Sequence, residues 1–189
     1  MQQKSSFDPA IMNDFPNFVT HLECSYTGEK LEAGQLHGLS PVGKPILVRY
    51  DLKALGKALS KKDLAQRPGG FWRYREFLPV RQAQNVVSLG EVMTPLLSLP
   101  SLAGKGGELI VKDEGRLPTG SFKARGLALA VSMAKELGVR RLAMPTNGNA
   151  GAAMAAYATR AGMETTIFCP DDTPEGHVSE IEFPGGKVE

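Results

Sequence analysis

Apolar residues follow two alternating patterns along the second half of the chain. Short runs of apolar and β-branched residues predict strands at residues 108–112, 141–145 and 165–169. Apolar residues at helical spacing predict helices at residues 121–137 and 150–161, and a glycine follows each helix. Because strands and helices alternate, we predict βαβ units and therefore an α/β fold with a parallel sheet flanked by helices.

Polar residues at the predicted helix starts suggest where the helices begin. Ser121 is predicted to cap the helix over residues 121–137. Thr173 is predicted to cap a third helix, with Pro174 at its first position. Residues 185–189 lie where another strand of the sheet is expected to begin.

The first half of the chain shows a weaker pattern. Residues 1–44 are rich in polar residues, glycine and proline, and predict an irregular N-terminal segment. The apolar run at 45–51 predicts a strand, and residues 52–66 predict a helix that ends at the Arg-Pro-Gly-Gly stretch over 67–70. Residues 71–77 are aromatic and charged, and are expected to form a helical turn packed on the core.

Two loops follow predicted strands, at residues 115–120 and 146–149. Ligands of parallel sheets bind beyond the carboxyl ends of the strands, so both loops are expected at the same edge of one sheet. Lys123 lies just after the first loop, in the first turn of a predicted helix. The helix dipole and the nearby Arg125 both oppose a positive charge there, which favours the neutral amine that attacks an aldehyde. Alternatively, Lys123 simply extends to solvent, and spacing alone favours that reading.

The second loop leads into a helix of small residues. Backbone N–H groups at such a helix start bind carboxylate or phosphate, and the Asn149 amide can donate a hydrogen bond to an oxygen of a ligand. The simpler interpretation is a turn whose asparagine side chains cap the helix. The small residues suggest close packing on a neighbour or a backbone that approaches a ligand.

Composition narrows the class of protein. The 189 residues include 22 Lys and Arg against 20 Asp and Glu, a net charge of +2, which argues against a nucleic-acid-binding surface. The cluster Lys61-Lys62 is read as a solvated helix end. Cys24 and Cys169 are far apart and require no disulfide. Without an apolar stretch of signal-peptide or membrane-spanning length, we expect a cytoplasmic protein with no membrane partner.

The two loops together resemble a known family. The stretch PTGSFKARG at residues 118–126 resembles the lysine motif of fold-type II pyridoxal-phosphate enzymes, and TNGNAG at 146–151 resembles their asparagine loop. The PTG lead-in, residues 43–52 and the stretch CPDDTP at 169–174 are most similar to the threonine synthases. The resemblance implies a fold like that of the tryptophan synthase β subunit, with residues 45–189 as the N-terminal part of the catalytic region.

The resemblance also implies roles for individual residues. Lys123 would bind pyridoxal 5'-phosphate as a Schiff base and transfer protons, Phe122 would pack near the cofactor ring, and Asn149 would donate to the ring oxygen. The substrate carboxylate would be held by Thr146, Asn147, Gly148 and Ala150. The implied reaction converts O-phospho-L-homoserine and water to L-threonine and phosphate. A homodimer is implied for the complete enzyme.

The sequence departs from the family at three places. The later glycine-rich loop for the cofactor phosphate and the hydroxyl residue that faces the ring nitrogen are not found before Glu189. We therefore expect a truncated form, incomplete at the C-terminus, in which activity is not assured. Cys24 has only His37 nearby and no paired cysteines, so no metal is predicted. Pro184 stands where the third helix would otherwise continue.

Two other functions remain open. A serine or threonine dehydratase shares the Ser-Phe-Lys-x-Arg-Gly core, but such enzymes tend to have His at the position of Ala150 and to lack a front segment like residues 20–52. A non-catalytic fragment is the third hypothesis. It predicts an exposed apolar sheet edge, which promotes association.

Overall fold

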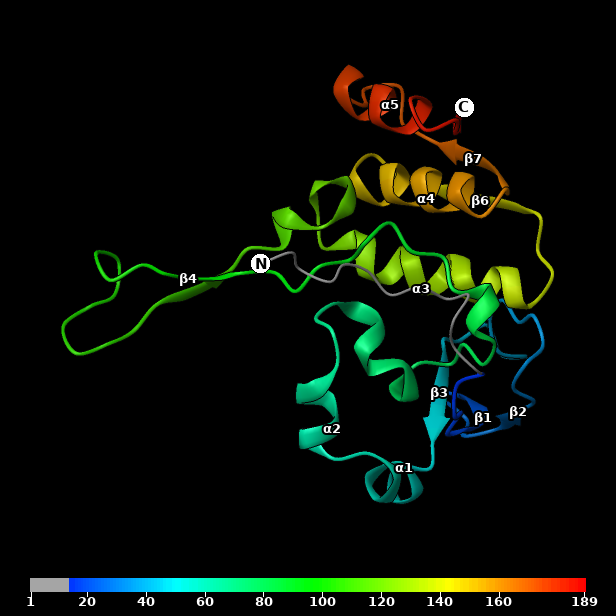
Figure 1. The fold of residues 1–189 in the computed structure, drawn as a ribbon. Helices are drawn as coiled ribbons and strands as arrows, with labels where there is room; N and C mark the ends of the chain where they lie inside the picture. Colours follow the sequence, from blue (N-terminus) through cyan, green and yellow to red (C-terminus); the bar gives the residue numbers. More distant parts are fainter. Residues whose placement is uncertain (1–13) are drawn as a thin grey trace.

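A parallel sheet forms the C-terminal part of the protein, as predicted. The computed structural model describes residues 14–189. Strands β6 (Arg141–Pro145), β7 (Glu164–Phe168) and β8 (Lys187–Val188) form a parallel sheet in the order β6-β7-β8. Helix α4 (Asn149–Arg160) connects the first two strands, and α5 (Glu175–Glu182) connects the last two. The predicted α/β architecture is therefore confirmed for this region (Figure 1).

Helices α3 and α4 carry the main core. Helix α3 (Lys123–Glu136) packs along α4, and Val131 and Tyr157 are fully buried at their contact region. Glycines with positive φ follow both helices, at 74° for Gly138 and 71° for Gly162, as the sequence predicts for helix C-termini. The other buried apolar side chains of this core are Phe15, Trp72, Val80, Ala83, Val86, Val87, Leu117, Ala124, Ala128, Ala158 and Met163.

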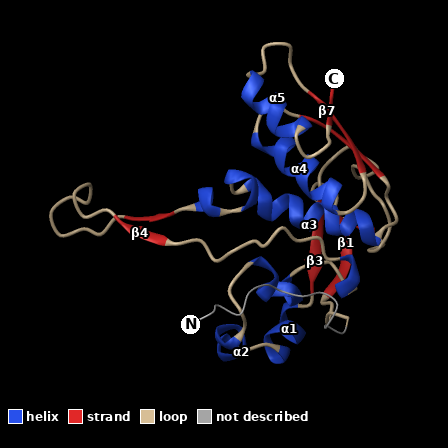
Figure 2. Cartoon of the chain, turned by 45° about the horizontal axis from the view of Figure 1, so that its top comes forward, coloured by secondary structure: helices blue, strands red, loops and turns tan. Residues whose placement is uncertain are grey.

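The N-terminal segment is more regular than its composition suggests. Strands β1 (Val19–Cys24), β2 (Lys30–Leu31) and β3 (Ile46–Tyr50) form an antiparallel sheet in the order β2-β1-β3, beside α3 (Figure 2). The expectation of an irregular segment up to residue 44 was therefore wrong for the first two strands, whereas the third matches the strand predicted at 45–51. The apolar signal of β1 and β2 is weak because Cys24 alone is buried among the residues of these two strands. The part of that expectation covering residues 1–13 lies outside the described residues.

The helix predicted over residues 52–66 is divided into two. Helix α1 (Leu52–Ala58) ends before Ser60, and Ser60 caps the separate helix α2 (Lys61–Gln66). The Ser60 hydroxyl accepts from the Asp63 N–H at 3.2 Å, and the Asp63 carboxylate accepts from the Ser60 N–H at 2.8 Å. This reciprocal pair starts a new helix and overrides the continuous apolar spacing. The predicted helical turn is confirmed as the 3-10 helix Phe71–Phe77, with Trp72 buried.

The strand predicted at residues 108–112 does not belong to the parallel sheet. Strand β5 (Ile110–Lys112) pairs antiparallel with β4 (Leu96–Ser98), and this hairpin extends away from the helices (Figures 1 and 2). Its side chains are exposed, including Leu96 at 66% and Ile110 at 48%. The predicted strand exists, but its assignment to a βαβ unit was wrong. A short apolar run does not reveal its pairing partner.

Both predicted side-chain caps are absent. Helix α3 begins at Lys123 with Phe122 at the cap position, and α5 begins at Glu175 with Pro174 at its cap position. Neither cap residue makes a side-chain hydrogen bond to its helix. The hydroxyls of Ser121 and Thr173 have no hydrogen-bond partner among residues 14–189.

Across those same residues, no helix is long and apolar enough to cross a membrane.

Candidate active site

The loop that leads to Lys123 contains a strained turn. It consists of the 3-10 helices Glu114–Arg116 and Pro118–Gly120. Thr119 has φ of 61° and Gly120 has φ of 65°. Glycine adopts this conformation without steric cost, but a β-branched residue there is strained by about 1–3 kcal/mol. Such strained residues cluster at functional sites, so this loop is a candidate part of a binding or catalytic site.

Lys123 is the first residue of α3 and follows an exposed aromatic ring. Its Nζ lies 5.0 Å from the centroid of the Phe122 ring, and Phe122 is 60% exposed. The Lys123 side chain is only partly buried. A primary amine and an open aromatic surface are therefore presented together at the start of the helix.

Two buried hydroxyl groups close to Lys123 in sequence have no hydrogen-bond partner among residues 14–189. Ser121 is 6% exposed, and its Oγ has no hydrogen-bond partner in the described part of the chain. The Thr119 Oγ1 is likewise buried and without a partner there. Buried hydroxyls are normally hydrogen-bonded, so these two atoms are candidates to contact a bound molecule.

The asparagine loop follows β6 at the carboxyl edge of the parallel sheet. The Thr146 N–H donates to the Phe168 carbonyl at 3.0 Å, and the Gly148 N–H donates to the Thr146 Oγ1 at 3.3 Å. Asn149 is the first residue of α4, and both Asn147 and Asn149 are exposed. No side chain caps this helix. The simpler interpretation, in which the asparagines cap α4, is therefore not supported.

Close packing explains the small residues that begin α4. A Cβ placed on Gly151 would lie 2.7 Å from the Thr146 Cγ2, 3.0 Å from the Ile181 Cδ1 and 3.1 Å from the Ile167 Cγ2. The helix start thus approaches β7 and α5 more closely than any side chain permits. This contact sets the position of Asn149 and Ala150 relative to the sheet.

The two loops lie together, although not in the way the sequence predicts. The turn Pro118–Gly120 contacts both α3 and α4. However, β5 is absent from the sheet that contains β6, so the two loops do not share one sheet edge. The packing of α3 on α4 brings them together instead.

Comparison with known proteins identifies the family. The family described as "Pyridoxal-phosphate dependent enzyme" matches residues 87–189, which include both loops. The chain belongs to the pyridoxal-phosphate dependent enzymes. The cofactor of this family is pyridoxal phosphate, as the resemblance implied.

Several curated proteins named threonine synthase are similar to the chain. The protein from Methanocaldococcus jannaschii is 35% identical over 87% of this chain and 42% of its own length. That from Halalkalibacterium halodurans is 43% identical over 57% of this chain and 31% of its length. That from Synechocystis sp. is 46% identical over 52% of this chain and 26% of its length. The chain thus spans less than half the length of these relatives.

The described residues fit the cofactor of the family in part. The exposed Phe122 ring can stack on a planar ring, and the Lys123 amine can bond to an aldehyde. The unpartnered hydroxyls of Thr119 and Ser121 can contact polar atoms of a ligand.

Residues 14–189 contain no group of three or more His, Cys, Asp or Glu side chains that could hold a metal ion. Cys24 and Cys169 form no disulfide bond.

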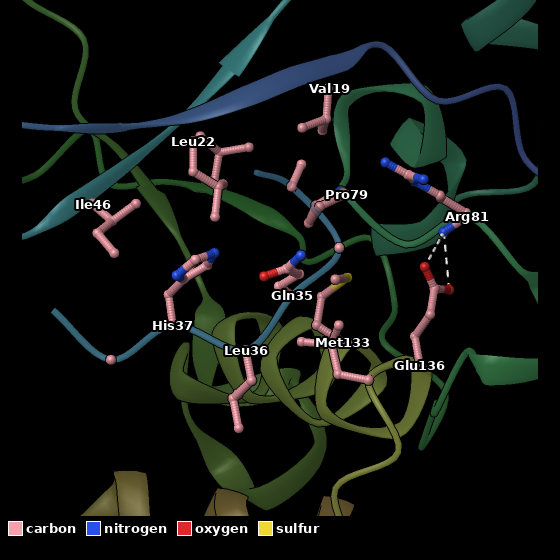
Figure 3. A pocket seen from close by; sticks show the side chains of 15 residues that line it. Val19, Leu22, Gln35, Leu36, His37, Ile46, Pro79, Arg81, Met133 and Glu136 are labelled. Atoms are coloured by element: carbon pink, nitrogen blue, oxygen red, sulfur yellow. Dashed lines mark hydrogen bonds between the residues drawn. The ribbon is translucent and has the colours of Figure 1, made fainter. Parts of the chain in front are cut away.

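A pyridoxal-phosphate enzyme is expected to have a cleft at its lysine, but the pocket in Figure 3 lies elsewhere. Strands β1 and β3, residues 33–38 and the C-terminal end of α3 line it, with Met133 and Glu136 contributed by the helix. That end of α3 is about 20 Å from Lys123, given the rise of an α-helix. The predicted site residues do not line this pocket.

Sequence reasoning missed the acidic partner of Arg125. The Glu114 carboxylate accepts from the Arg125 Nε at 2.7 Å and from its Nη2 at 3.1 Å. Hydrogen bonds from Arg125 and Thr94 lower the pKa of Glu114 to about 2. The Glu114 carboxylate therefore compensates part of the Arg125 charge that was expected to act on Lys123. The sequence signal for this pair was an acidic residue at the start of the same loop.

Proposed function

We propose that the chain is the N-terminal part of a threonine synthase, which converts O-phospho-L-homoserine and water to L-threonine and phosphate. The observation that carries this proposal is the similarity to the Methanocaldococcus jannaschii threonine synthase over 87% of the chain. That alignment of 168 residues extends in front of the family match at 87–189. It therefore includes most of the front segment, residues 20–52, that argued against a dehydratase.

Pyridoxal phosphate, when bound, supplies an electron sink for the carbon atoms of the substrate. We assign Lys123 as the residue that binds the cofactor covalently, and its amine then moves protons at the substrate. Its place at the start of α3, beside the exposed Phe122 ring, supports this assignment. Phe122 is assigned to pack beside the cofactor ring.

The asparagine loop is proposed to hold the substrate. Exposed Asn149 can donate its side-chain amide to the ring oxygen of the cofactor. The backbone N–H groups of Asn147 and Ala150, with the side chain of Thr146 and the open backbone at Gly148, are proposed to hold the substrate carboxylate. The absence of a side-chain cap on α4 supports this, because the helix start remains available to an anion.

The first experiment tests covalent binding. The purified chain is mixed with pyridoxal phosphate, its absorption spectrum is recorded, and borohydride reduction is followed by peptide mapping. We expect a visible band and a label on Lys123. Lys123→Ala should lose both, whereas Lys135→Ala at the far end of α3 should keep them. Label spread over exposed lysines without a distinct band would count against the assignment of Lys123 in this chain.

A second experiment separates the alternatives of the reaction. A threonine synthase releases phosphate from O-phospho-L-homoserine and forms L-threonine, whereas a dehydratase forms a 2-oxo acid and ammonia from L-serine or L-threonine. A folded chain that shows neither the threonine synthase reaction nor the dehydration of L-serine or L-threonine would favour a non-catalytic fragment. A cytoplasmic location and a homodimer for the complete enzyme belong to the same proposal.

A further inference from the structure

The start of α3 has no side-chain cap. The Ala124 and Arg125 N–H groups donate to the Ser121 and Phe122 carbonyls, each at 3.2 Å, but these short-range bonds have poorer geometry than those of the helix interior, so a first turn without a side-chain cap frays more easily. Phe122 stands at the cap position without a side-chain hydrogen bond, and the hydroxyl of Ser121 has no partner among residues 14–189. Nevertheless, Lys123 in this turn must keep a fixed direction to serve as the cofactor lysine.

A polar cluster ties the first turn to two other segments. The Glu114 cluster consists of Thr94, Lys112, Glu114 and Arg125. Thr94 is 3% exposed, and its hydroxyl donates to the Glu114 Oε1 at 2.6 Å and accepts from the Lys112 Nζ at 2.6 Å. Arg125 donates to both Glu114 oxygens, at 2.7 and 3.1 Å. The cluster therefore joins both ends of the hairpin β4–β5 to the first turn of α3.

The helical repeat explains how this cluster can act on Lys123. Successive residues of an α-helix are rotated by about 100°, so side chains two positions apart leave on nearly opposite sides. Arg125 faces Glu114, and Lys123 is therefore directed away from the cluster. Ala124 lies between them in sequence, is fully buried, and packs its face of the turn against the core. Fixing Arg125 thus fixes the rotation of the first turn about the helix axis.

The ion pair in the cluster differs from an ordinary surface pair. The side chains of Arg125 and Glu114 are 26% and 24% exposed, and the guanidinium makes a forked contact. Arg116, on the same loop, pairs with Asp113 at 3.0 Å through a single contact, and its side chain is 70% exposed. Forked pairs with little exposure fix geometry, whereas exposed pairs contribute little.

We infer that the Glu114 cluster anchors the first turn of α3, which has no side-chain cap, and sets the direction of the Lys123 side chain. Arg125 and Glu114 are positioning residues, acting on the amine through the backbone of the first turn. This inference rests on the proposed role of Lys123.

Competitive labelling of lysines tests the inference. In each folded protein, the extent of labelling of Lys123 is divided by that of the exposed Lys30 of β2. This labelling ratio is measured once with pyridoxal phosphate and borohydride, and once with limiting acetic anhydride. In Arg125→Met, the Lys123 to Lys30 ratio should fall about tenfold with pyridoxal phosphate, because a displaced amine no longer meets the site geometry. With acetic anhydride the same ratio should rise about threefold, because a frayed turn exposes the amine.

Matched variants keep the test decisive. Arg116→Met removes an exposed arginine from the same loop and should leave both ratios within about twofold of the unsubstituted chain. Arg125→Lys retains the charge without the fork, should give intermediate ratios, and serves if Arg125→Met does not fold. Unchanged ratios in a folded Arg125 variant would overturn the inference. Failure of pyridoxal phosphate to label Lys123 in the unsubstituted chain would count against the proposed function alone, since the anhydride ratio still tests the cluster.

Discussion

Removal of the Tyr157 hydroxyl should measurably destabilise the protein. Tyr157 is fully buried, and its hydroxyl donates to the Glu91 Oε1 at 2.5 Å. Glu91 is 5% exposed and accepts three further hydrogen bonds, from the Trp72 Nε1 at 3.2 Å, the Ser88 Oγ at 2.6 Å and the Leu89 N–H at 2.9 Å. This carboxylate joins α4, the 3-10 helix Phe71–Phe77 and the segment before the hairpin.

The expected magnitude follows from the hydrogen bond that is lost. Tyr157→Phe keeps the ring and its packing, and leaves Glu91 with its three other donors. A hydrogen bond to a carboxylate contributes about 1.5–3 kcal/mol, so the free energy of unfolding should fall by about 2 kcal/mol. Tyr74→Phe is the matched control, because Tyr74 is 44% exposed, and it should change that free energy by less than about 0.5 kcal/mol.

Urea unfolding followed by circular dichroism measures both variants, with the slope of the transition checked for constancy. If Tyr157→Phe loses less than about 0.5 kcal/mol, as the control does, then this hydroxyl does not stabilise the buried carboxylate. Burial and the bond to Glu91 raise the pKa of Tyr157 well above its usual range. The unfolded chain therefore releases this proton first, so stability should decline as pH rises above about 10, and Tyr157→Phe should show a smaller decline.

Two further predictions concern the site itself. Gly151→Ala should cost about 1–3 kcal/mol in thermal unfolding, because its Cβ would lie 2.7 Å from the Thr146 Cγ2. Gly126→Ala on α3 meets open space and should instead gain about 0.5–1 kcal/mol, and equal effects of the two substitutions would contradict this packing argument. The pKa of Glu114 is lowered from 4.5 to about 2 by hydrogen bonds from Arg125 and, second, from Thr94. The stability that this carboxylate contributes should therefore be present above about pH 4.5 and be lost as the pH falls toward about 2. Acid unfolding followed by circular dichroism should therefore show a smaller loss in Glu114→Gln than in the unsubstituted chain, and identical acid transitions would speak against the pair.

Local patterns predicted the C-terminal half well because its elements are defined by contacts close in sequence. The strands at 141–145 and 165–169 and the small-residue helix between them are apolar on the sides that the sheet buries. Their order along the chain implies a parallel pairing. The strand at 108–112 carries the same apolar signal, yet it pairs with β4. Nothing in its own residues distinguishes a hairpin strand from a sheet strand.

Helix starts were predicted less well. Ser60 and Ser121 are both hydroxyl residues before apolar positions, but only Ser60 has an acidic residue three positions on to complete a reciprocal pair. At α3, the stabilising contact comes instead from Glu114 and Thr94, which are 11 and 31 positions from Arg125 in sequence. A local motif cannot reveal a partner at that separation.

The amino-acid sequence alone predicted the alternation of strands and helices, the glycine ends of α3 and α4, and the two loops that resemble the family. These features depend on the residue types of short segments, whose conformational preferences are local. Three further features were visible only in the folded protein: the hairpin β4–β5 lies outside the parallel sheet, Glu114 pairs with Arg125, and the packing of α3 on α4 brings the two loops together. Those features depend on contacts between segments that the chain separates, and such contacts form only when the core is assembled.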